Sequence, residues 1–401
     1  MNLVEVGVFV LYLAGLLGVG VWFFFKGKDD GEKGYFLGGR QMGPWVTALS
    51  AGASDMSAWV LMGLPTSVYA LGLGQMWIAV GLALGYTLSW IYQAPRLRTF
   101  SIVANDSITI PEYLTNRFLS KSRALQIVCA VVFLVAYTIY SASSIKACGT
   151  LFNTVTGLET EIAMYLAAFI IIAITFLGGF SAVCWTDFLQ ALLIFGAMLI
   201  APLFAYAFVD ASKVATIPAE FWNPMSSWKD IVSGLGWGLG YFGMPHILLR
   251  FMAIRKEGEL KMSRRIAVVW VVISLAVAVF IGILGRQLFP VAHLTKAGAE
   301  SIFITLSQSF LPPILAGFVM AGILAATISS SDSYLLIAAS AFAKNIFQGV
   351  VKKNATDTAD TGADFLCSIN YVETEIGNFI TDVLYTDKPM EYTEPMVAAM
   401  L

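Results

Sequence analysis

The chain is a succession of apolar segments, each bounded by charged residues or by glycine and proline. A membrane-spanning helix needs about 20 predominantly apolar residues, because the hydrocarbon core of a bilayer is about 30 Å thick. Hydrophobic residues make up 58% of this sequence and charged residues 12%, whereas a soluble domain carries about 25% charged residues. The pattern therefore predicts an all-α integral membrane protein. The expected spans cover residues 3–25, 45–70, 73–94, 124–152, 161–180, 186–209, 231–252, 265–289 and 313–346.

Charge divides the chain into two parts. Residues 1–353 form the expected transmembrane domain, with about nine helices. Residues 354–401 hold nine acidic residues and one lysine and have no apolar segment of membrane length, which predicts an acidic, partly disordered cytoplasmic tail. The first span lacks a basic leader and a small-residue cleavage site, so we expect a retained helix rather than a signal peptide.

Lysine and arginine set the expected orientation, because short cytoplasmic loops retain positive charge. Basic residues concentrate at 26–44, 95–123, 250–265 and 344–353. The prediction is a multi-pass protein of the plasma membrane with its N-terminus outside and its tail in the cytoplasm. Lys146 lies within a span but near its outer end, where a lysine either extends to the surface or has a functional role.

Two of the spans are poor membrane helices. The span at 45–70 contains serine, glycine and aspartate in its first half, and the span at 231–252 contains alternating glycines and a proline. Glycine loosens a helix and proline removes a backbone donor, so both spans are expected to unwind near the midplane. Irregular backbone at that depth lines binding sites in transporters built from inverted repeats, and the separation of five spans fits two five-helix repeats. The alternative is that the glycines form helix-packing faces.

Polar side chains mark candidate sites within the spans. Placing a carboxylate within a membrane costs free energy, so Asp55 is a candidate functional residue. The alternative is that Asp55 caps a half-helix. The segment 325–333 reads AATISSSDS and places hydroxyls beside a carboxylate. Such oxygens are ligands for small hard cations, unless the serines bond to carbonyls of their own helix.

Several motifs carry a family resemblance. The segments LGGRQMGPWVTALSAGASDMSAWVLMGLP at 37–65, GWGLGYFGMPHILLRFMA at 236–253 and the serine segment at 321–333 closely resemble the sodium/proline symporters of the sodium:solute symporter family. ITIPEYLTNRF at 108–118 and GGFSAVCWTDFLQA at 178–191 fit the same pattern. The resemblance covers about residues 1–350 and implies a leucine-transporter-like inverted-repeat helix bundle with an extra N-terminal helix.

The resemblance also implies site residues. Sodium would be bound by oxygens of Ala53, Met56, Ala326, Ser329 and Ser330, where the family often has threonine at the last position. Residues expected to couple sodium to transport are Asp55, Ser57, Arg40 and Asp187. The proline-binding and gating set would be Tyr140, Trp237, Tyr241 and Pro245. Aromatic faces and a broken helix suit proline, because it is a compact zwitterion with an apolar ring.

The predicted function is sodium-coupled import of L-proline, or a related small amino acid, by alternating access. No cofactor is expected beyond sodium as the coupling ion, and the expected partners are the solute, sodium and the bilayer, without nucleic acid. An enzyme is not expected, because the motifs HExxH, GxSxG and a P-loop are absent in a suitable context.

The resemblance ends near residue 350, where the family continues with further helices. The second repeat would then hold about three helices where the fold has five. Two explanations of the shortened second repeat are open. The sequence is either an incomplete gene product or a natural short form that a partner or a second copy completes. The alternative function is a solute sensor or receptor of the same fold that has lost transport.

Overall fold

The computed structural model describes residues 3–26, 31–209, 214–225, 227–290 and 301–351. These ranges fold into helices without a β-strand, apart from an isolated bridge between Met42 and Ile254. The acidic tail expected at 354–401 lies outside the described residues.

The α-helices follow the apolar pattern of the sequence. They are α1 (Leu3–Lys26), α2 (Gly31–Leu37), α3 (Pro44–Asp55), α4 (Leu64–Leu71), α5 (Met76–Leu88), α6 (Ala94–Val103), α7 (Ile110–Arg117), α8 (Ala124–Thr156), α9 (Thr160–Phe208), α10 (Trp228–Trp237), α11 (Pro245–Ala253), α12 (Leu260–Leu288), α14 (Ile302–Phe310) and α15 (Pro313–Ser340). Short 3₁₀ or π segments connect them at η1 (Gly38–Arg40), η2 (Trp59–Gly63), η3 (Leu73–Gln75), η4 (Ser89–Gln93), η6 (Ala219–Trp222), η7 (Gly238–Phe242), η8 (Glu257–Glu259) and η9 (Ala341–Val351).

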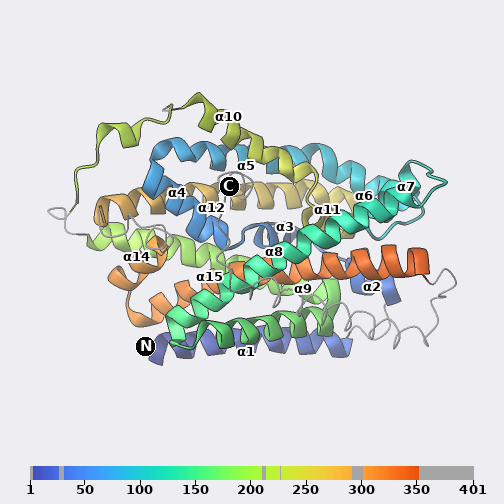
Figure 1. The fold of residues 1–401 in the computed structure, drawn as a ribbon, viewed down its shortest axis with the longest axis horizontal. Coiled ribbons are helices and arrows are strands. Elements are labelled where there is room, and N and C mark those ends of the chain that lie inside the picture. Colours follow the sequence, from blue (N-terminus) through green and yellow to red (C-terminus); the bar gives the residue numbers. More distant parts are fainter. Residues whose placement is uncertain (1–2, 27–30, 210–213, 226, 291–300, 352–401) are drawn as a thin grey trace, which may run out of the picture.

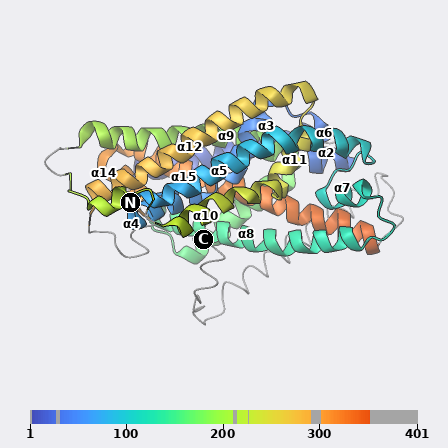
Figure 2. The same cartoon turned by 90° about the horizontal axis from the view of Figure 1, so that it is seen from above.

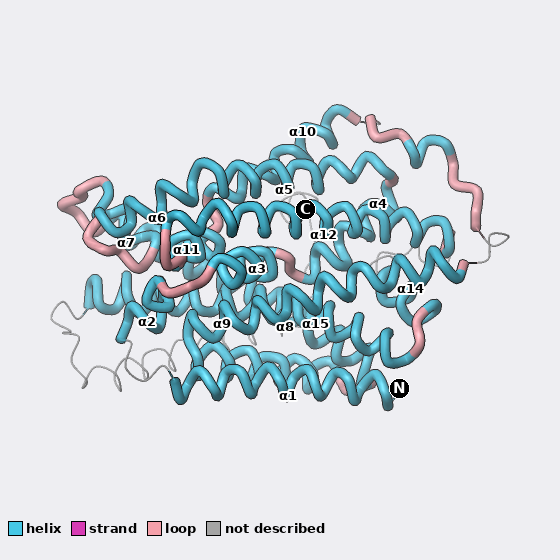
Figure 3. Tube along the Cα trace, turned by 180° about the vertical axis from the view of Figure 1, so that it is seen from behind, coloured by secondary structure: helices cyan, strands magenta, loops and turns pink. Residues whose placement is uncertain are grey.

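Helix α15 lies at the centre of the bundle. It packs against α8, α9 and α1 and also contacts α3, and most of its residues are buried. On the other side of α3, α12 packs on α4 and α5, and α10 packs on α5. Figures 1 and 3 show α1 at one edge of the bundle and α5 with α10 at the opposite edge, and Figure 2 shows α10 running beside α5. The first broken span thus brings α3 against the central α15, whereas α10 of the second broken span lies beside the outer α5.

The chain reverses within the segment labelled α9. Gly179 has φ 54° and ψ −156°, which is not helical, and separates two helical pieces. A Cβ there would approach Tyr35 to 2.8 Å, so both the backbone conformation and the close packing require glycine. The expected spans 161–180 and 186–209 leave residues 181–185 for the turn between them. The structure instead reverses at Gly179, because residues 180–185 are already helical.

Helices lie over all of the expected spans, although not all are continuous. In the described residues, five helices are long and apolar enough to cross a membrane, and Trp59–Leu71 and Thr160–Phe176 are shorter apolar helices. The remaining spans are interrupted by the breaks described below. Helix α14 was not expected, because its short apolar run lies outside the nine predicted spans.

Candidate functional site

The two glycine-rich spans are broken, as the sequence predicted. Helix α3 ends at Asp55; Met56 has φ −78° and ψ 76°, and the π-helical η2 starts at Trp59. In the other span, α10 gives way to η7, and α11 starts at Pro245 after a non-helical Met244. Backbone and side-chain groups at both breaks are therefore available for contacts outside their own helix.

Oxygens from α3 and α15 converge at the first break. The Ser329 hydroxyl lies 2.8 Å from the carbonyl oxygen of Ala53 and 3.2 Å from that of Ala326, to which the Ser330 hydroxyl donates at 3.0 Å. All four residues are fully buried. Met56 is also buried and lies at the helix break. An all-oxygen donor set without a carboxylate suits a hard monovalent cation, because hydroxyls can rotate to present lone pairs.

Bonding within the helix accounts for other hydroxyls of the serine segment. Thr327 and Ser331 donate to carbonyls four residues earlier, at 2.9 and 2.7 Å. Ser330 does the same, whereas Ser329 also reaches across to α3. The alternative of back-bonding is therefore correct for part of the segment.

Asp55 joins the two broken helices. Its Oδ2 accepts a hydrogen bond from the Tyr241 hydroxyl at 2.5 Å, and its Oδ1 lies 3.9 Å from Nε2 of His246. The carboxylate therefore reaches across to η7 and α11 instead of capping its own half-helix. Ser57 acts locally, because its hydroxyl accepts from the backbone N–H of Trp59 at 3.2 Å and supports the break.

The expected substrate residues lie on separate elements. The Trp237 ring stacks on Trp59 with centroids 4.9 Å apart, and Tyr241 packs edge-on against Tyr86 at 5.2 Å. Tyr140 on α8 is 57% exposed, and its ring lies 5.4 Å from Tyr334. Pro245 is buried at the start of α11.

Asp187 lies apart from the oxygen cluster, in a buried ion pair. Its Oδ2 lies 2.6 Å from the guanidinium of Arg250 and accepts from Ser50 at 2.8 Å. Arg250 also donates to Ser50, Ser333 and the carbonyl of His246. The counting of Arg250 as a cytoplasmic loop base was therefore wrong, because its side chain is only 2% exposed within the bundle.

Arg40 lies in η1, and the twelve residues of α3 separate it from the break. Its guanidinium donates to Asp106 at 3.1 Å and to carbonyls of Met252 and Ser107 at 2.7 and 2.9 Å. Lys33 also pairs with Asp106. Burial raises the pKa of Asp106, but the hydrogen bond from Lys33 and the charge of Arg40 hold this pKa below its ordinary value. The structure thus places Arg40 in a charged cluster at the end of the bundle, not at the oxygen cluster.

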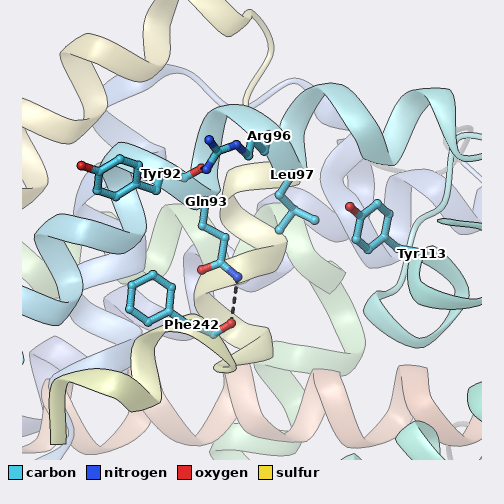
Figure 4. Close-up of a pocket in the computed structure, with 6 residues that line it drawn as sticks. All are labelled: Tyr92, Gln93, Arg96, Leu97, Tyr113 and Phe242. Atoms are coloured by element: carbon cyan, nitrogen blue, oxygen red, sulfur yellow. Dashed lines mark hydrogen bonds between the residues drawn. The ribbon is translucent and has the colours of Figure 1, made fainter. Parts of the chain in front are cut away.

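An open cavity of about 300 Å³ lies between η4, α6, α7 and η7. Its lining residues are Tyr92, Gln93, Arg96, Leu97, Tyr113 and Phe242 (Figure 4). Gln93 donates to the carbonyl of Phe242 at 2.8 Å, which ties η4 to η7. The predicted substrate residues do not line this cavity, although Phe242 directly follows Tyr241.

Sequence reasoning missed Arg250, His246, Tyr137 and Tyr334. Arg250 lies within the predicted span 231–252, and an intramembrane aspartate such as Asp187 calls for a cationic partner. His246 directly follows Pro245, so the sequence could also have predicted that it lies at a helix break. The two tyrosines had no comparable signal, because aromatic residues are common in apolar spans.

A family model and several curated proteins match this chain over most of its length. The model of the sodium:solute symporter family matches residues 35–369. The chain is 39% identical over 344 residues to the high-affinity proline transporter PutP of Bacillus subtilis, covering 84% of this chain and 73% of that protein. It is 40% identical over 361 residues to the sodium/proline symporter of Escherichia coli, covering 87% and 71%. The match to the sodium/proline symporter of Staphylococcus aureus is 38% over 333 residues, covering 81% and 65%.

Solved structures share the fold. A Na⁺-coupled sialic acid symporter in a substrate-bound outward-open state superposes with a TM-score of 0.80 at 20% identity, covering 96% of this chain and 83% of that chain. A nucleobase-cation-symport-1 family transporter in a closed conformation gives a TM-score of 0.52 at 16% identity, covering 88% and 77%. These likenesses concern the arrangement of the helices.

Proposed function

This chain belongs to the sodium:solute symporter family, and from that membership we propose that it is a transporter that imports L-proline together with sodium. It is a multi-pass membrane protein. The named relatives are proline transporters, and sodium is part of the name of several of them.

The observation that carries the proposal is the contact between Ser329 and Ala53. It joins the break of α3 to the central α15 through buried oxygens. We assign the sodium ion to the oxygens of Ala53, Met56, Ala326, Ser329 and Ser330. A cation there adds attraction between α3 and α15, so it favours the state in which both contribute ligands.

Substrate binding is assigned to the second break and the facing tyrosines, namely Tyr140, Trp237, Tyr241 and Pro245. The hydrogen bond between Tyr241 and Asp55 links this region to the helix that contributes sodium ligands. Asp55 and Ser57 are the proposed coupling residues at the break. Asp187 accepts a hydrogen bond from Ser50 of α3, and Arg40, which precedes α3, donates to the Met252 carbonyl of α11, so both are proposed to position α3. A ligand that favours one arrangement of α3 then raises the affinity for the other ligand.

The proposed orientation follows the basic loops. The N-terminus lies outside and residues 354–401 extend into the cytoplasm as an acidic tail of the transmembrane domain 1–353. The basic segments at 26–44, 95–123 and 250–265 contact one another through Arg40, Arg98 and the backbone near Ile254, so they share one side.

The experiment is uptake of labelled L-proline by proteoliposomes with and without an inward sodium gradient. Ser329→Ala and Ser330→Ala each remove one proposed ligand and are expected to raise the sodium concentration for half-maximal uptake about tenfold, which corresponds to about 1.4 kcal/mol. Ser331→Ala is the matched control, because that hydroxyl donates to the carbonyl of Thr327 at 2.7 Å, and Thr327 is not among the proposed ligands. Asp55→Asn is expected to abolish coupled uptake.

Three outcomes would contradict the proposal. Uptake that is independent of sodium excludes symport. Equal effects of the alanine variants at Ser329 and Ser331 exclude the assigned sodium ligands. Sodium-dependent binding of proline without uptake points to a receptor.

A further inference from the structure

His246 has a buried nitrogen without a hydrogen-bond partner among the residues that the structure describes. It is the second residue of α11, and its side chain is 4% exposed. Its Nδ1 lies 3.0 Å from the hydroxyl of Tyr137. Its Nε2 makes no hydrogen bond to the described residues. A buried polar atom left unpaired costs free energy, so its persistence calls for an explanation.

The nitrogen faces one oxygen of Asp55. Oδ2 of that carboxylate already accepts from Tyr241, and Oδ1 lies 3.9 Å from Nε2 of His246. This separation is too long for a direct hydrogen bond. A nitrogen placed about 2.8–2.9 Å from both atoms bridges them with donor–acceptor distances typical of hydrogen bonds.

The tautomer of His246 decides what such a group must be. If Nδ1 carries the proton and donates to the Tyr137 oxygen, Nε2 is an acceptor. Asp55 Oδ1 and His246 Nε2 then form a pair of acceptors, one charged and one neutral. Their complement is a cationic nitrogen with two N–H groups.

Aromatic rings surround this pair. The Tyr334 ring lies 5.3 Å from the His246 ring and 5.3 Å from that of Tyr137, and Tyr140 lies 5.4 Å from Tyr334. Tyr137 and Tyr334 are buried, whereas Tyr140 is exposed. Ring faces attract a cation and also accommodate an apolar ring.

We propose that Asp55 Oδ1 and His246 Nε2 together bind the amino nitrogen of the substrate, with Tyr137 holding the imidazole in the accepting tautomer. The inference rests on the proposed function and specifies its substrate class as α-amino acids with a cyclic secondary amine. A secondary ammonium fills both acceptors. A primary ammonium brings a third N–H into an aromatic-lined site, where an unpaired donor is unfavourable.

The first test compares proline with N-methyl-L-proline as competitors of labelled proline uptake in proteoliposomes. N-methylation keeps the charge and the ring but removes one N–H, so it should weaken competition at least tenfold in the unmodified protein. In His246→Met, which fills a similar volume without an acceptor, the advantage of proline over N-methyl-L-proline as a competitor should fall below about threefold. His246→Gln offers an oxygen acceptor and should retain part of the ratio.

A second measurement needs no change at His246. The sequence has two histidines, His246 and His293, so His293→Gln leaves one imidazole to observe by ¹⁵N NMR. Nε2 should show the shift of an unprotonated nitrogen and should move when proline is added with sodium. A protonated Nε2 that does not respond to proline would overturn the inference.

The outcomes separate the two proposals. Absence of sodium-dependent proline uptake by the unmodified protein refutes the proposed function. Normal uptake combined with an unchanged proline preference in His246→Met refutes the role of His246 alone.

Discussion

Arg250 connects four helices through one buried guanidinium. Its partners are Ser50 on α3, Asp187 on α9, the His246 carbonyl on α11 and Ser333 on α15. The ion pair to Asp187 is 2.6 Å long and both side chains are almost fully buried. Desolvation offsets much of the attraction within such a pair, but removal of one partner leaves an uncompensated charge.

Arg250→Met is expected to destabilise the protein by about 3–5 kcal/mol, because it leaves the Asp187 carboxylate without its cation. Thermal unfolding of the detergent-solubilised protein measures this effect. The double variant Arg250→Met with Asp187→Leu removes both charges and should recover much of the loss. Arg255→Met is the control, since Arg255 pairs at the surface with Glu259, four residues later. A double variant as unstable as the single one would contradict this account.

Residues of the candidate site were predictable from the sequence where they belong to a local motif. Ser329 and Ser330 belong to a motif, and the structure places the Ser329 hydroxyl against the Ala53 carbonyl, whereas Ser330 bonds to Ala326 of its own helix. Arg250 and Asp187 are 63 positions apart, so only the packing of α9 and α11 on α3 brings them together. The roles of the site residues stay predictions until the uptake experiments are done.

Among the elements, α5 and the broken helix α10–η7 make an unusually close contact. A Cβ on Gly85 would lie 2.0 Å from the Gly238 oxygen, and one on Gly81 would lie 2.1 Å from the Gly234 oxygen. Backbone therefore packs directly on backbone along this contact, as small residues permit in membranes. The glycines of this span serve helix packing as well as the break, so both interpretations of the sequence apply.

Gly85→Ala is expected to push α5 away from η7, because the Gly238 backbone has no side chain that can move aside. The cost of such overpacking is typically about 1–3 kcal/mol, and proline uptake should fall with it because η7 carries Tyr241. Unfolding temperature and initial uptake rate measure the two effects.

Gly236→Ala is the matched control, since a Cβ there meets no atom within 4 Å. It should leave stability and uptake nearly unchanged. If the two alanine variants behaved alike, the close contact would not support the position of η7.

Element boundaries were less predictable than element positions. The glycines and prolines of spans 45–70 and 231–252 predicted the breaks, but they did not specify that α3 ends at Asp55 or that α11 starts at Pro245. The reversal at Gly179 depends on a positive φ and on packing against Tyr35, and neither property is visible in the apolar pattern.

At the scale of the whole molecule, the basic segments gather at one end of the bundle. Arg40 bonds to Met252 and Ser107, Arg98 bonds to Ile254, and Lys344 pairs with Glu32. Figure 1 shows α2, α6 and α7 at this end and the N-terminus at the other. The charge pattern of the sequence therefore agrees with the arrangement of the helices, and the positive-inside rule predicts that this end is cytoplasmic.

Single-cysteine labelling in whole cells tests this orientation. In a background with Cys129, Cys148, Cys184 and Cys367 replaced by serine, a cysteine is placed at exposed Glu220 in η6 or at exposed Lys256 before η8. A membrane-impermeant maleimide should label Glu220→Cys on intact cells, because η6 lies at the end opposite the basic segments. Lys256→Cys should react only after permeabilisation. The reverse pattern would invert the proposed topology, and labelling of both on intact cells would mean that these two positions do not lie on opposite sides of the membrane.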